Sequence, residues 1–154
     1  MSFRILGLDP EAFRDLHSLP AEELEARGVQ RVEVEKPHSA PCRISLDDEP
    51  PGAQVLLLNY LHQPAQTPYR QQGPIFIGAA MERVDYVDAI PPALARRTLS
   101  LRGFDADDMM TEADIVEGGE AGAMIERFFA NARVQYIHVH YARRGCFAAV
   151  VQRL

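Results

Sequence analysis

The stretch Tyr136-Ile137-His138-Val139-His140-Tyr141-Ala142-Arg143-Arg144-Gly145-Cys146, near the C-terminus, decides the predicted fold. Successive side chains of a strand point to opposite faces, so the alternation places His138 and His140 on one face. Arg143-Arg144-Gly145 fits a three-residue hairpin loop, with glycine at the position that needs a left-handed backbone. The sequence therefore predicts a β-hairpin formed by residues 134–142 and 146–152, internal to a sheet.

The length of this loop decides where the nearby thiol points. In the three-residue register Ala142 lies opposite Cys146, and Cys146 then shares the face of His138 and His140. A two-residue loop, Arg144-Gly145, would move the thiol to the opposite face. We expect the three-residue register, which gathers two imidazoles and a thiol on one side of the hairpin.

Outward from the hairpin, short strands and short helices alternate with turns. Apolar alternation and continuous apolar runs predict strands at residues 3–8, 29–35, 42–46, 55–61, 75–77, 98–104 and 109–116. Capping and proline signals predict helices that begin near Asp9-Pro10-Glu11, Pro20 and Pro91-Pro92, and helical spacing predicts one over 120–130. Residues 62–74 form an irregular segment. The pattern predicts an α+β fold with a mostly antiparallel or mixed sheet, a few short helices and the C-terminal β-hairpin.

Composition limits the classes of function. A chain of 154 residues fits a single domain, residues 1–154. The formal net charge of −6 argues against binding to nucleic acid and to an anionic membrane surface. No apolar run approaches the ~18 residues of a membrane span, and no signal peptide is evident, so we expect a cytosolic protein. Its two cysteines are then expected to be thiols, although a Cys42–Cys146 disulfide stays open.

Several sequence blocks resemble, in the same order, the bacterial family known as domain of unknown function 1203. They are Pro41-Cys42-Arg43-Ile44-Ser45-Leu46, Leu56-Leu57-Leu58-Asn59-Tyr60, His62-Gln63-Pro64, Pro68-Tyr69-Arg70, Gly73-Pro74-Ile75-Phe76, Leu99-Ser100-Leu101-Arg102, Met109-Met110 and residues 136–148. The chain departs from the family at Tyr141, where asparagine is usual, and at Asp108, where glycine is usual. The resemblance implies a bacterial cytosolic protein and supplies no activity, substrate or cofactor.

The first class of function is a pocket for a small anionic ligand at one end of the sheet. Its catalytic groups would be His138 and His140, as proton donors or acceptors, and the thiol of Cys146 as a nucleophile. Guanidinium forks bind carboxylates and phosphates, so we expect several arginines to converge there. The ligand-binding residues would be His62, Tyr69, Arg70 and Arg143, and the other candidate arginines are Arg43, Arg102 and Arg144. Such a pocket suits a small enzyme and a ligand sensor equally well.

Two further classes remain open. His-x-His on a strand is a recurrent metal-ligand spacing, with His62, Cys146 or Cys42 as candidate third ligands. Because no third ligand can be identified from spacing, the sequence assigns no metal site. The third class is a non-catalytic scaffold or homodimer, in which buried polar groups and surface ion pairs are purely structural.

Overall fold

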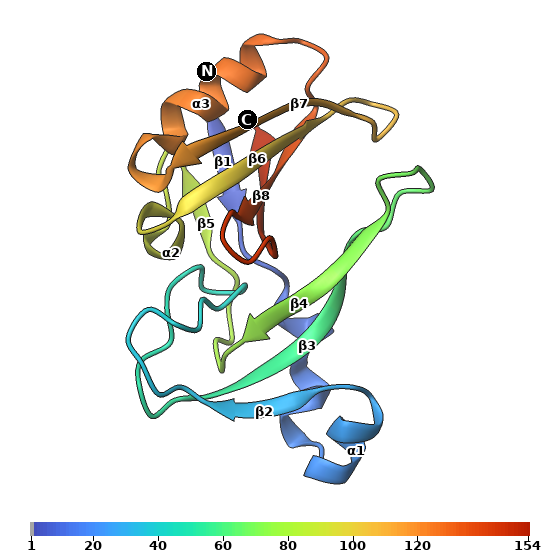
Figure 1. The fold of residues 1–154 in the computed structure, drawn as a ribbon, viewed down its shortest axis with the longest axis vertical. Coiled ribbons are helices and arrows are strands. Elements are labelled where there is room, and N and C mark those ends of the chain that lie inside the picture. The colour runs from blue at the N-terminus through green and yellow to red at the C-terminus, as the bar shows by residue number, and fades with distance from the viewer. Residues whose placement is uncertain (1) are drawn as a thin grey trace.

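In the computed structural model, which describes residues 2–154, nine strands form two sheets (Figure 1). The larger sheet has the spatial order β5-β1-β9-β8-β6-β7, with β1 (Phe3–Leu6), β5 (Asp85–Val87), β6 (Thr98–Phe104), β7 (Met110–Glu117), β8 (Tyr136–Tyr141) and β9 (Phe147–Arg153). The smaller sheet has the order β2-β3-β4, with β2 (Gln30–Glu33), β3 (Gln54–Gln63) and β4 (Gln71–Ile77). Every paired strand runs antiparallel to its neighbour. The predicted α+β class and C-terminal hairpin are confirmed.

Helices are short, apart from α3 (Ala121–Ala130), which packs on the larger sheet (Figure 1). Ile125, Phe128 and Phe129 recur at helical spacing and are buried there. Single turns make up the rest: the 3₁₀ helices η1 (Pro10–Ala12), η2 (Arg14–Ser18) and η3 (Gly118–Glu120), and the α-helices α1 (Ala21–Ala26) and α2 (Pro92–Ala95). Within residues 2–154, no helix has the length and apolarity needed to cross a membrane.

Two main apolar cores follow from the alternation of side chains along the strands. On the larger sheet, Leu101 of β6 and Val139 of β8 face α3 and join its core. On the smaller sheet, Leu56, Leu58, Ile75 and Ile77 pack with residues of the N-terminal segment, which are Phe13, Leu24 and Val29. Each sheet therefore has one face sealed by apolar contacts.

The opposite face of the larger sheet is polar and turns toward the smaller sheet. Ser100 of β6 lies across from His140 of β8, and Arg102 lies across from His138. The ring of His62, at the end of β3, lies 5.0 Å from the ring of His140, measured between centroids. The fold thus places both hairpin histidines between the two sheets.

The end of the hairpin differs from the predicted register. Val139 lies opposite Ala149, as predicted, but a bulge then pairs His140 with Phe147. The Tyr141 N–H donates to the carbonyl oxygen of Cys146 at 2.9 Å. Because the extra residue inverts the side-chain alternation, Phe147 shares the histidine face, and Cys146 packs against the core on the other face. The prediction that the thiol shares the histidine face is wrong.

Two local predictions also differ from the structure, and one strand, β5, was not predicted. Residues 42–46 form turns and isolated bridges, not a strand, and Leu46 has a left-handed φ of 53°. The apolar residues of this coiled segment, Cys42, Ile44 and Leu46, are buried in the two cores. They alternate with polar residues along the sequence, as the residues of a strand would. The irregular segment is confined to residues 64–70, because β3 and β4 extend into it. Strand β5 is only three residues long and carries no periodic signal.

Candidate functional site

The first candidate site lies between the two sheets and is named the histidine cleft. It encloses about 270 Å³. Its lining residues come from β3, β4, the loop between them and the polar face of the larger sheet: His62, Gln63, Pro68, Tyr69, Arg70, Gln71, Arg102, Phe104, Met110, His138 and His140. Two arginines and no carboxylate are among these residues, so the lining as described is electropositive.

Hydrogen bonds fix two of the three imidazoles in the cleft. The carbonyl oxygen of Gly145 lies 2.9 Å from His140 Nδ1, so Nδ1 carries the proton and Nε2 is left as an acceptor. Arg102 Nη1 lies 3.5 Å from that Nε2 and 3.3 Å from Gln71 Oε1. His62 Nε2 lies 3.1 Å from the same Gln71 oxygen and donates to it. Arg102 and Gln71 therefore join β3, β4 and β8 in one polar network.

Burial keeps these histidines uncharged at neutral pH. It lowers the pKa of His138 to about 3, with further lowering by the nearby His140, His62 and Arg102. It likewise lowers the pKa of His140 to about 4, against the hydrogen bond to Gly145. His138 Nδ1 is buried without a hydrogen-bond partner in the described structure. Neutral rings of this kind can accept a hydrogen bond from a ligand, whereas their lowered pKa opposes the uptake of a proton.

In the described structure, the three histidines are not arranged as a group of metal ligands. Within the part of the chain that the structure describes, no group of three His, Cys, Asp or Glu side chains is arranged to hold a metal ion. His140 Nδ1 and His62 Nε2 are engaged with protein oxygens. The guanidinium of Arg102 lies beside His140 Nε2, where its positive charge would oppose a bound cation. The proximity of the three rings therefore does not make them a set of ligands.

The second candidate site lies at one end of the larger sheet and is named the arginine pocket. It encloses about 540 Å³ and shares no lining residue with the histidine cleft. Its walls come from the segment before β3, from β4, from the residues after α2, from the ends of β6, β7 and β8, and from the hairpin loop: His38, Ser39, Pro41, Arg43, Phe76, Arg96, Arg97, Thr98, Glu117, Tyr141, Arg143, Arg144 and Cys146. Five of these residues are arginines and one, Glu117, is a carboxylate.

Arg43 is the buried charge of this pocket, with 1% of its surface exposed. Its Nε donates to the carbonyl oxygen of Phe147 at 2.8 Å, and its Nη1 to that of Pro41 at 2.5 Å. Its Nη2 donates to Cys146 Sγ at 3.3 Å. None of these partners carries a carboxylate, so the guanidinium is hydrogen-bonded but its charge is not neutralised. Burial correspondingly lowers the pKa of Arg43.

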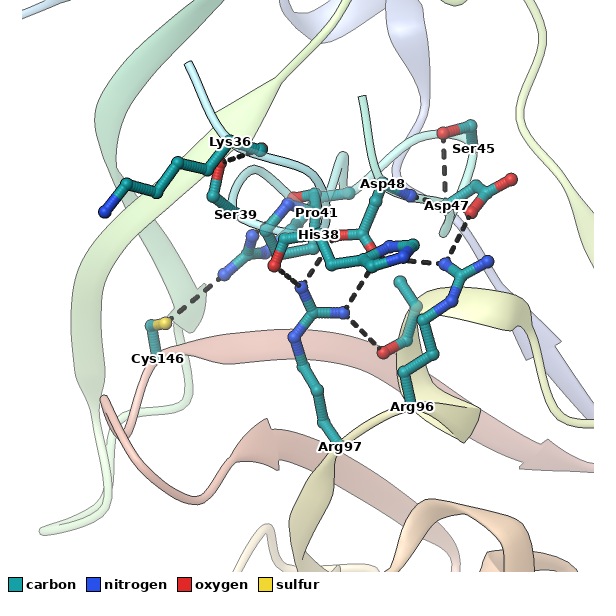
Figure 2. A network of polar contacts seen from close by, with 12 residues as sticks. Lys36, His38, Ser39, Pro41, Ser45, Asp47, Asp48, Arg96, Arg97 and Cys146 are labelled. Carbon is teal, nitrogen blue, oxygen red and sulfur yellow. Dashed lines mark hydrogen bonds and ion pairs between the residues drawn. The ribbon is translucent and has the colours of Figure 1, made fainter. Parts of the chain in front are cut away.

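Two other arginines of the pocket are neutralised. Asp48, whose side chain is 4% exposed, accepts hydrogen bonds from Arg97 Nη2 at 2.6 Å and from Arg96 Nη1 at 3.0 Å. Figure 2 shows both guanidiniums turned toward the segment that carries Asp47 and Asp48, with Cys146 on the far side of the network. These contacts anchor the loop before β3 to the end of α2.

Arg143 and Arg144 differ from that pair. Both are exposed on the hairpin loop, and within residues 2–154 neither has an ion pair or a side-chain hydrogen bond. Two long, exposed cations at a pocket rim attract anions without any internal carboxylate competing for them. Together with Arg43, three of the five guanidiniums in the arginine pocket have no carboxylate partner.

Of the two positions at which the chain departs from the resembled family, Tyr141 lies at a candidate site and Asp108 lies at neither. Tyr141 lines the arginine pocket, and its buried hydroxyl has no hydrogen-bond partner in the described structure. Arg43 and Arg97 each lie 5.0 Å from the centroid of its ring. Asp108 has a left-handed φ of 60° and accepts a hydrogen bond from the Tyr136 hydroxyl at 2.6 Å. Glycine suits that backbone, whereas aspartate adds a side-chain acceptor.

The structure divides the predicted site residues between the two sites. His62, Tyr69, Arg70, His138 and His140 line the histidine cleft. Arg143 and Cys146 line the arginine pocket, on the other side of the hairpin. The expectation that all seven surround one hollow is therefore wrong. The physical reason is the bulge before His140, which turns the thiol away from the imidazoles.

Sequence reasoning missed the role of Asp48, Arg96 and Arg97. The signal available was only a run of acids followed, far along the chain, by two adjacent arginines. Nothing in the sequence pairs these segments, because sequence separation carries no information on distance. Arg43 was among the arginines predicted to converge on one pocket. Its burial was not predicted, because arginine is rarely buried.

Fold and sites together define an antiparallel α+β protein with two electropositive pockets on either side of one hairpin. The family model described as "Protein of unknown function (DUF1203)" matches residues 39–153, and the chain belongs to that family. The matched range contains the whole lining of the histidine cleft and that of the arginine pocket except His38. Comparisons with curated proteins and with solved structures give no match.

Proposed function

We propose that this protein binds a small anionic ligand in the arginine pocket. The observation that carries the proposal is the burial of Arg43 without a carboxylate partner, beside the unpaired Arg143 and Arg144. A buried cation is costly unless an opposite charge approaches it, and a bound phosphate or carboxylate supplies that charge.

The size and chemistry of the pocket support the same ligand class. A volume of about 540 Å³ is within the range of small-molecule sites. Ser39, Thr98 and Tyr141 add hydroxyl groups to its walls. Arginine forks favour planar or tetrahedral oxyanions, so phosphate esters and small di- or tricarboxylates are the expected ligands.

The second candidate is binding of the same ligand class in the histidine cleft. Arg70 and Arg102 line the cleft without a lining carboxylate, and His138 has an unpartnered ring nitrogen. In that case the neutral His138 and His140 would accept hydrogen bonds, while the arginines would hold the charge. The smaller volume of the cleft, about 270 Å³, favours the arginine pocket for anything larger than a simple oxyanion.

The test is a thermal-shift and calorimetric titration at low salt with phosphate, sulfate and citrate. Arg143→Ala combined with Arg144→Ala is expected to weaken binding about tenfold or more, because two attracting charges are removed. His140→Ala tests the histidine cleft. Arg27→Ala, an exposed arginine outside both sites, is the matched control.

The outcomes separate the candidates. Loss of binding only in the double arginine variant supports the arginine pocket, and loss only in His140→Ala supports the cleft. If no anion binds the unmodified protein, or if all the variants bind it equally, the proposal is wrong.

We also propose a bacterial cytosolic location for the protein. Both cysteines are free, as expected of a reducing compartment.

The alternative of a non-catalytic scaffold or homodimer predicts that no anion changes the thermal stability of the protein. The homodimer also predicts a dimeric mass by light scattering.

A further inference from the structure

We infer that Cys146 is a thiol–disulfide exchange site for small disulfides that bear carboxylates, and that the resulting mixed disulfide blocks the arginine pocket. This inference rests on the proposed function, since the pocket must first attract the anionic disulfide. Three features carry it: the contact between Cys146 and Arg43, the lining of the pocket, and the unpartnered hydroxyl of Tyr141.

The first feature is the immediate partner of the thiol. Arg43 uses Nε and Nη1 on the carbonyl oxygens of Phe147 and Pro41, so its guanidinium is held in one orientation. In that orientation Nη2 lies 3.3 Å from Cys146 Sγ. Among the groups hydrogen-bonded to Arg43, only the thiol can become an anion. A thiolate at Cys146 would neutralise a guanidinium that has no carboxylate partner, and the thiolate is the nucleophile in disulfide exchange.

The second feature is access. Cys146 is half-buried and lines the arginine pocket together with Arg143 and Arg144. A disulfide that enters the pocket can therefore reach the sulfur, and the two exposed arginines can hold its carboxylates during the approach. In Figure 2, Cys146 faces the polar network from the hairpin side.

The third feature is an unfilled hydrogen-bonding position. Tyr141 is 5% exposed and lines the same pocket, and its hydroxyl has no partner in the described structure. Burial raises the pKa of Tyr141 to about 12, despite the nearby charges of Arg43 and Arg97, so the phenol keeps its proton. The charges of Arg43, Arg97, Asp48 and Cys146 act on this hydroxyl, and a carboxylate bound among these residues would supply the acceptor that the buried hydroxyl lacks.

The exchange step balances without another reactant. The thiol proton goes to solvent, and Cys146 Sγ attacks one sulfur of the small disulfide. The new sulfur–sulfur bond forms as the old one breaks, and the other half of the disulfide leaves as a thiolate. Cys42 cannot resolve the product, because it is fully buried and its sulfur accepts hydrogen bonds from the backbone N–H groups of Ile44 and Gly78. The adduct therefore persists until an external thiol reduces it.

The experiment compares two aromatic disulfides, the dianionic dithiobis(nitrobenzoate) and the uncharged dithiodipyridine, reacting with the folded native protein. Each rate is divided by the rate of the same reagent with free cysteine. The normalised preference for the dianion is expected to reach about tenfold and to fall toward one in Arg143→Ala/Arg144→Ala, which removes the charges at the rim. Arg27→Ala should keep the preference, and Cys146→Ser should remove native-state labelling. These variants leave the hydrogen bonds of Arg43 to its two carbonyls untouched.

Two results would overturn the inference: labelling of Cys42 instead of Cys146, or a normalised preference for the dianion no greater than one, the value that free cysteine has by definition. Anion binding by Cys146→Ser, measured with phosphate and citrate, distinguishes the two proposals. If that variant binds anions while the wild-type thiol shows no preference, the exchange site is wrong and the proposed function stands. If neither anion binding nor a preference is found, both are wrong.

In the wild type, the mixed disulfide should abolish citrate binding, and reduction should restore it.

Discussion

Arg43 is a charged side chain held by uncharged groups. It ties the carbonyl oxygens of Phe147 and Pro41 to the sulfur of Cys146, and so links the segment before β3 to the C-terminal hairpin. Arginine is rarely buried without a carboxylate, because desolvation of the charge must be offset by hydrogen bonds alone. At the level of single residues, this is the feature that joins stability to the proposed site.

Arg43→Leu is expected to lower the free energy of unfolding by about 2–4 kcal/mol, because two buried carbonyl oxygens lose their donors. Urea denaturation at neutral pH measures the change. Arg27→Ala, which is exposed, should change stability by less than about 0.5 kcal/mol. Equal stability of Arg43→Leu and wild type would show that the hydrogen bonds contribute nothing net.

The buried histidines make stability depend on pH. Burial lowers the pKa of His138 to about 3 and that of His140 to about 4, from an ordinary value of 6.5. Below pH 6.5 the unfolded chain therefore takes up protons that the folded chain does not. The free energy of unfolding should fall by up to about 1.4 kcal/mol per pH unit for each histidine as the pH drops toward about 4.

Urea denaturation at several pH values between about 7 and 4 tests this dependence. His138→Gln removes one titrating group, so its stability should change less steeply with pH than that of the wild type. Asp48, whose pKa is lowered from 3.8 by Arg97 and Arg96 despite the opposing effect of burial, loses its stabilising charge only below this window. Parallel pH profiles for wild type and variant would contradict the assignment.

At the level of elements, the β-bulge between β8 and β9 has the largest consequence. It preserves the predicted pairing up to Val139 and reverses the facing of Phe147 and Cys146 beyond it. The ring of Phe147 then stacks on His62 with centroids 5.1 Å apart, and the thiol turns to the arginine pocket. One inserted residue thus separates two sites that the sequence predicted as one.

Two glycines near α3 give opposite predictions. A Cβ on Gly118 would lie 2.0 Å from the carbonyl oxygen of Leu94, whereas a Cβ on Gly122 would meet nothing within 4 Å. Gly118→Ala should therefore lower the free energy of unfolding by about 1–3 kcal/mol through overpacking. Gly122→Ala, within α3, should raise it by about 0.5–1 kcal/mol through helix propensity. Thermal unfolding of the two variants side by side checks both signs.

At the level of the whole molecule, the two sheets share several connections. β1 pairs in the larger sheet, and the chain then passes directly to Phe13, which is buried in the core of the smaller sheet. Gly7 makes this crossing possible, since a Cβ there would lie 2.0 Å from the carbonyl oxygen of Ile44. The family match begins at residue 39, so the crossing strand lies before the matched range.

Because of these connections, both sheets should unfold together as the predicted single domain. Differential scanning calorimetry is expected to show one transition, with a calorimetric to van't Hoff enthalpy ratio of about 1. Two resolved transitions, or hydrogen exchange that opens β2–β4 well before the larger sheet, would show that the sheets are separate units.

The amino-acid sequence by itself determined the α+β class, the C-terminal hairpin, the family and a helix over 120–130, which the structure has at Ala121–Ala130. These depend on local periodicity, on capping residues and on contiguous motifs, all of which are present along the chain. It also identified the histidines and arginines as the polar groups of interest. The predicted strand at 42–46 was wrong, because a coiled segment that packs on a core shows the same alternation.

Only the tertiary structure decided which of those groups meet. The bulge before His140 lies where β8 pairs with β9, which is itself paired with β1, and Asp48 reaches Arg96 and Arg97 across the fold. Contacts of this kind join residues far apart in the chain, where no local pattern records them. Burial, which leaves Arg43 without a counter-charge and His138 uncharged, is likewise a property of the assembled core and not of any single segment.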